Sequence, residues 1–63
     1  MRDQIYYRLV EKNNRLEFHV SIDKADVEAE QALGKAIALG SPKLEEFRAA
    51  CLAEAKIYKM DEV

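Results

Sequence analysis

The dipeptide Asn13-Asn14 lies between two stretches in which apolar and polar residues alternate, and this restricts the first part of the chain to a β-hairpin. Asparagine tolerates the left-handed backbone conformation that both central positions of a type I′ turn require. The pattern therefore predicts an antiparallel hairpin over residues 4–22, with period-two alternation along both strands. Six apolar side chains then share one face, in the pairs Leu9 with Phe18, Tyr7 with Val20, and Ile5 with Ile22.

The other face of the predicted hairpin collects polar and aromatic side chains. An aromatic ring, a guanidinium and an imidazole on one pleated surface could stack on a base or hold an anion. An ordinary solvated sheet surface with cross-strand pairs explains the same residues and is the commoner case. The candidate ligand or partner surface consists of Tyr6, Arg8, His19 and Ser21.

The rest of the chain predicts two helices joined by a sharp corner. Asp23 is a suitable N-cap for a helix over residues 24–39, which would end at Gly40. Ser41 would cap a second helix over residues 42–60, whose first residue is proline. The expected fold is α+β, a single domain of residues 1–63. In it a two-stranded antiparallel hairpin precedes an antiparallel helical hairpin, and the last three residues form a frayed tail.

Both predicted helices carry apolar residues on two sides, and a helix of that kind needs two neighbours. The core stripe of the second helix is Leu44, Phe47, Cys51, Ala55 and Tyr58. The surplus apolar positions, which form a candidate oligomer interface, are Ala49, Ala53, Ile57 and Met60 in the second helix and Val27, Gly34 and Ala38 in the first. Gly34 is either a tolerated surface glycine or a point where another helix approaches closely.

The size of the chain also points to a partner. A domain of 63 residues buries only about 60% of its unfolded surface, so small domains are usually stabilised by a disulfide, a metal or another chain. Cys51 is the only cysteine, which excludes an internal disulfide. With His19 as the only histidine, a structural zinc site lacks ligands. We therefore expect no cofactor and a homo-oligomer, most simply a dimer.

Catalytic groupings are scarce in the sequence. Cys51 and His19 are the only nucleophile and base that could pair, and they are expected on different sides of the hairpin. The acidic residues between Asp23 and Glu30 do not have the spacing of a calcium loop and are typical of a solvated helix start. No glycine-rich phosphate-binding motif is present.

The charge distribution gives little support to nucleic-acid binding. The net charge is −2, and no basic stripe of the kind that binds phosphate backbones is present. No stretch approaches membrane-spanning length, and a single free cysteine without a signal peptide indicates the cytoplasm.

Three functions are compatible with these features. The leading hypothesis is a small homo-oligomeric interaction or regulatory module without catalytic activity, whose partner is its own copy and in some settings another protein. The alternatives are a β-ribbon nucleic-acid-binding protein and a small-molecule sequestering protein with sites between subunits. Within the oligomer hypothesis, the sequence favours the helix face over a strand edge, because the helix face offers more apolar area.

Overall fold

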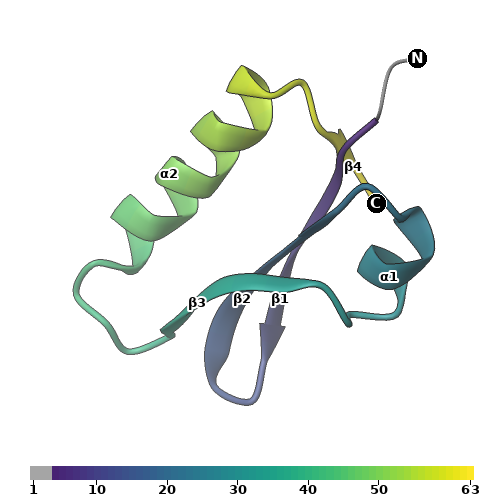
Figure 1. The fold of residues 1–63 in the computed structure, drawn as a ribbon. Coiled ribbons are helices and arrows are strands. Elements are labelled where there is room, and N and C mark those ends of the chain that lie inside the picture. The colour runs from purple at the N-terminus through teal and green to yellow at the C-terminus, as the bar shows by residue number, and fades with distance from the viewer. Residues whose placement is uncertain (1–3) are drawn as a thin grey trace.

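The computed structural model describes residues 4–63, which form one four-stranded sheet and two helices (Figure 1). The elements are, in chain order, β1 (Tyr6–Lys12), β2 (Arg15–Ser21), α1 (Lys24–Glu28), β3 (Leu33–Ala38), α2 (Leu44–Ile57) and β4 (Asp61–Glu62). The strand order is β3-β2-β1-β4; β4 runs parallel to β1, and the other pairs are antiparallel. The expected α+β class is confirmed. Residues 1–3 of the predicted domain lie outside the described residues.

The predicted hairpin and its register are confirmed. Asn13 and Asn14 form the turn with φ angles of 54° and 61°, the left-handed conformation that a type I′ turn requires. The predicted pairs within the strands are present, namely Leu9 with Phe18, Tyr7 with Val20, Arg8 with His19, and Tyr6 with Ser21. The third apolar pair is wrong, because Ile22 lies beyond the end of β2 and is 67% exposed.

The first predicted helix is wrong beyond its first turns. Asp23 does cap α1, and its Oδ1 accepts a hydrogen bond from the Ala25 N–H at 3.0 Å. The helix then ends because Glu30 adopts a left-handed φ of 57°. The N–H of Glu30 bonds the Val27 carbonyl and the N–H of Gln31 bonds the Asp26 carbonyl, which together make a Schellman motif. The chain reverses there and continues as β3 instead of a helix.

The second predicted helix is confirmed in its centre and corrected at both ends. The Ser41 Oγ accepts a hydrogen bond from the Lys43 N–H at 3.1 Å, so the residues after Ser41 form a turn and α2 begins at Leu44. A second Schellman motif ends α2, with Lys59 at φ 53° and the N–H of Met60 bonded to the Ala55 carbonyl. The expected frayed tail is wrong, because Asp61–Glu62 pair with β1 as β4.

The core lies mainly between the sheet and α2. Lys35 pairs with Phe18 across the sheet, and its Nζ lies 3.0 Å from Glu54 of α2, so the Phe18 face of the sheet is the face that α2 covers. The buried apolar side chains are Leu16, Phe18, Val27, Cys51 and Ala55. Cys51 and Ala55 confirm part of the predicted core stripe of the second helix. Tyr58 was expected in that stripe, but it is 59% exposed because α2 ends before it.

Gly34 has a clear role in β3. The pairing with β2 shifts between Phe18 and His19, so Gly34 is an extra residue in a β-bulge. A Cβ atom on Gly34 would lie 3.2 Å from the carbonyl oxygen of Phe18, which lies in β2 opposite the bulge. The close approach that the sequence suggested is therefore to the backbone of β2 rather than to another helix.

We predict that Gly34→Ala lowers the free energy of unfolding by on the order of 1 kcal/mol, because the Phe18 carbonyl cannot move without disturbing the ladder. Gly40→Ala is the matched control, since a Cβ there meets no atom within 4 Å and Gly40 has no positive φ. The control should be neutral or slightly stabilising, because alanine restricts the unfolded chain. Urea denaturation of both variants measures the difference, and equal midpoints would contradict this account of the bulge.

Candidate functional site

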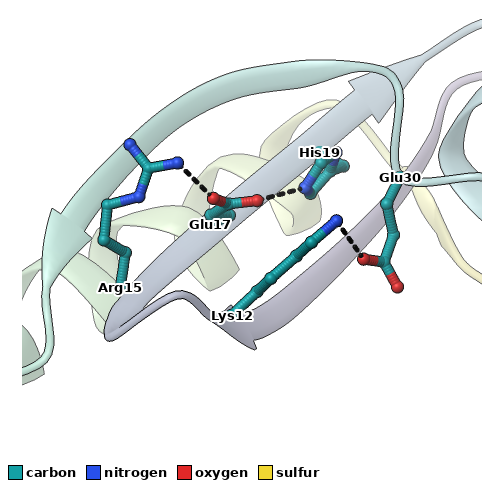
Figure 2. A network of polar contacts seen from close by, with 5 residues as sticks. All are labelled: Lys12, Arg15, Glu17, His19 and Glu30. Carbon is teal, nitrogen blue, oxygen red and sulfur yellow. Dashed lines mark hydrogen bonds and ion pairs between the residues drawn. The ribbon is translucent and has the colours of Figure 1, made fainter.

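A cluster of charged side chains lies on the hairpin face opposite α2, and we call it the polar cluster: Lys12, Arg15, Glu17, His19 and Glu30. Figure 2 shows these side chains on one side of the hairpin, with α2 in pale green and yellow behind the sheet. Arg15, Glu17 and His19 share a face because they alternate along β2. Glu30 enters from the left-handed turn after α1, and its carboxylate lies 3.3 Å from the Lys12 Nζ.

Glu17 is the centre of the polar cluster. Its Oε2 accepts a hydrogen bond from Arg15 Nη2 at 2.6 Å, and its Oε1 lies 3.0 Å from His19 Nε2. Glu17 is only 4% exposed and His19 only 1% exposed, although glutamate is rarely buried without a partner. A buried carboxylate needs such donors, because an unpaired buried charge is strongly destabilising.

The electrostatics of the polar cluster favour a structural role for Glu17. The hydrogen bond from His19 lowers the pKa of the Glu17 carboxyl, burial opposes this effect, and Arg15 lowers the pKa further. Glu17 is therefore an ionised acceptor at neutral pH, and a carboxylate with a lowered pKa is a poor general base. Because an ionised carboxylate only accepts hydrogen bonds, His19 Nε2 carries the shared hydrogen. His19 Nδ1 is buried without a hydrogen-bond partner among the described residues.

The candidate ligand surface predicted from the sequence is largely engaged within the chain. Arg8 Nε donates a hydrogen bond to the Val63 carbonyl at 3.1 Å, and Ser21 Oγ accepts one from the Asp23 N–H at 2.9 Å. His19 is buried against Glu17, and Tyr6 is half-buried. Glu17 and Arg15 were not among the predicted site residues, although they alternate with His19 in the predicted hairpin register.

Cys51 and His19 lie on different faces of the sheet. Cys51 is fully buried in α2 on the Phe18 side, whereas His19 belongs to the polar cluster on the other side. Burial raises the pKa of the Cys51 thiol, and Lys35 opposes this only in part. No pocket and no group of three metal-ligating side chains occurs among residues 4–63. The fold thus keeps the Cys51 thiol and the His19 imidazole apart.

The candidate interface residues fall into three groups. Val27 is the buried residue of α1 and is not available to a partner chain. Gly34 and Ala38 belong to β3, an outer strand of the sheet, and not to a helix. Ala49, Ala53 and Ile57 are exposed on α2, while Met60 is half-buried just after it. Ile57, at 72% exposure, is the only large side chain of the exposed three.

No family model, curated protein or solved structure matches the chain. Among the described residues, neither helix is long and apolar enough to cross a membrane.

We predict that Glu17 makes the folded protein less stable in acid. Its pKa is lowered in the folded state, so its contribution to stability is present above the ordinary glutamate pKa of about 4.3 and is lost as the pH falls through the lower, folded value. Glu17→Gln should therefore flatten the acid side of the stability profile. Thermal melts from pH 3 to 7 measure this, and Glu46→Gln on exposed α2 is the matched control. Identical slopes in wild type and Glu17→Gln would contradict the prediction.

We also predict that Cys51 is chemically inert in the folded protein. Burial and a raised thiol pKa both disfavour the reactive thiolate. A chromogenic thiol reagent should react slowly with native protein and rapidly after denaturation in urea. Cys51→Ala should lower the free energy of unfolding by about 1–2 kcal/mol through lost packing. Rapid native reaction would instead indicate an accessible, activated thiol.

Proposed function

We propose that this protein is a cytoplasmic interaction module that has no catalytic activity and works as a homodimer. The observation that carries the proposal is the incomplete burial of apolar side chains in the single chain. Among residues 4–63, five hydrophobic residues are buried, and the large apolar side chains left exposed are Ile22, Leu33, Leu52, Ile57 and Tyr58. Association with a second chain is the usual way for a domain of this size to gain buried surface.

The polar cluster supports a structural reading over a catalytic one. Its central carboxylate is paired with Arg15 and hydrogen-bonded to His19, and its pKa is moved away from the range of a base at neutral pH. Hydrogen bonds on both oxygens of a buried carboxylate hold the side chains of neighbouring positions in one register and make that sheet face more rigid. The cluster thus gives the module a fixed sheet, which is a suitable support for a binding surface.

The rival functions draw less support from the geometry. A β-ribbon nucleic-acid binder needs free cations on its reading face, but Arg8 and Arg15 are engaged with a backbone carbonyl and with Glu17. A sequestering protein would have to form its ligand site between two copies, because the described chain contains no pocket. Self-association is the step that both the leading function and the sequestering alternative share.

We predict that the chain sediments at micromolar concentration with twice its monomer mass of 7.2 kDa. Its thermal midpoint should rise with protein concentration, because mass action stabilises a folded dimer over unfolded chains. Sedimentation equilibrium and melts over a hundredfold concentration range measure both quantities. A mass of 7.2 kDa with a concentration-independent midpoint would refute the homodimer.

A further inference from the structure

The two edges of the sheet differ in whether other residues of the chain cover them. At the β1 edge, the N–H groups of Asp61 and Val63 bond the carbonyls of Ile5 and Tyr7, both at 2.9 Å. The C-terminal residues therefore cover part of that edge. At the other edge, no described residue pairs with the outer side of β3. An uncovered edge strand is a template for pairing with another strand.

The backbone groups that β3 offers can be identified from its register. Leu39 donates its N–H to the Asn14 carbonyl at 3.1 Å, and Ile37 and Lys35 are the next residues that bond β2 by antiparallel alternation. The N–H and C=O groups of Ala36 and Ala38 consequently point away from β2. These two residues present two donors and two acceptors along the open edge.

β3 has few of the features that usually keep an edge strand from pairing with another chain. β3 contains no proline, and its only charged residue is Lys35. The Lys35 Nζ is held 3.0 Å from Glu54 of its own α2 and lies over the Phe18 and Phe47 rings, so it does not project along the edge. The bulge at Gly34 disturbs one end and leaves residues 35–38 as a regular edge.

We propose that β3 pairs antiparallel with β3 of a second copy around a twofold axis at Ile37, which joins the two sheets into one of eight strands. The inference rests on the homodimer proposed above and names the surface that forms it. In this register Ala36 lies opposite Ala38 of the second copy, and four backbone hydrogen bonds form. Ile37 faces its own copy on the α2 side of the sheet.

A second copy of the chain fits this edge because the edge is self-complementary. The register brings Lys35 opposite Leu39 of the second copy, so no like charges face each other. A twofold axis at Ala36 would instead draw Gly34 and its bulge into the new ladder. The axis at Ile37 is therefore the one that uses only the regular part of the strand.

The outer face of α2 is the competing surface. Its exposed apolar side chains are the large Leu52 and Ile57 and the small Ala49 and Ala53. Lys56 lies on the same side of the helix and would approach its own copy in a symmetric contact. The α2 face also offers no unpaired backbone groups that would fix the orientation of a partner. We therefore place the dimer interface at the β3 edge and not at the helix face that the sequence favoured.

The test compares proline at the two sheet edges. Ala36→Pro removes an outward N–H and keeps the ladder to β2, because proline is tolerated on the open side of an edge strand. Two intermolecular hydrogen bonds are lost by symmetry, so the dimer should dissociate at least about tenfold more readily. Glu62→Pro is the matched control. Its N–H points outward from β4, since Asp61 and Val63 make the bonds to β1. Sedimentation of Glu62→Pro should remain that of wild type.

A cross-linking experiment tests the register and does not depend on the folding of Ala36→Pro. Ile37→Cys places two thiols opposite each other across the axis, within the Cα separation that a disulfide needs. Lys35→Cys lies on the same face but about 13 Å from its copy, four residues along the paired strands. Mild oxidation should cross-link Ile37→Cys into a covalent dimer and leave Lys35→Cys and wild type monomeric in a denaturing gel. Peptide mapping excludes bridges through Cys51.

The outcomes separate the two proposals. A monomeric wild-type chain would overturn both the homodimer and the paired edge. Three results together would overturn the paired edge alone, in a wild-type chain that is a dimer. Ile37→Cys would form no covalent dimer, Ile57→Asp would dissociate the dimer, and Ala36→Pro would leave the dimer intact. In that case the homodimer would stand, with α2 as its surface. A covalent dimer of Ile37→Cys with an intact Ile57→Asp dimer supports the β3 pairing.

Discussion

The register of the β1–β2 hairpin is the constraint on which the rest of the molecule depends. The turn at Asn13-Asn14 sets which residues of β2 point to each side of the sheet, because a slip of one residue would exchange the two faces. β2 is buried on both sides. Leu16 and Phe18 pack under α2, whereas Glu17 and His19 lie in the polar cluster on the other side. One local turn thus fixes both the apolar core and the charged network.

The hairpin was predictable because its signals are local and agree with one another. The Asn-Asn turn, the alternation and the apolar pairs all specify the same register. The core positions of α2 were predictable for a similar reason, since Cys51 and Ala55 follow helical spacing. The polar cluster was only partly predictable. His19 was expected on the correct face, but the alternation alone does not reveal that Glu17 and His19 are buried there.

The parts that the sequence could not predict begin at two residues with left-handed backbone. Glu30 and Lys59 end α1 and α2 in Schellman motifs, a position that glycine usually fills. Because glutamate and lysine are good helix formers, nothing in the sequence marks these ends. The alanine-rich segment after Glu30 fits a helical pattern equally well. Its pairing with β2 is a tertiary interaction, which overrides a propensity difference of well under 1 kcal/mol per residue.

These two chain reversals also explain why the sheet is partly covered at its β1 edge and open at its β3 edge. The reversal at Lys59 returns the chain to β1, where β4 and the Arg8 bond to Val63 cover part of the edge. The reversal at Glu30 sends the chain to the outer side of β2, where β3 becomes an edge with no further strand of the described chain beside it. From β3 the chain crosses over to α2, and the ion pair of Lys35 with Glu54 turns the one charge on that strand towards the helix. The open edge therefore carries small side chains, two outward peptide groups and no free charge, and these are the properties that allow a strand to pair with its own copy.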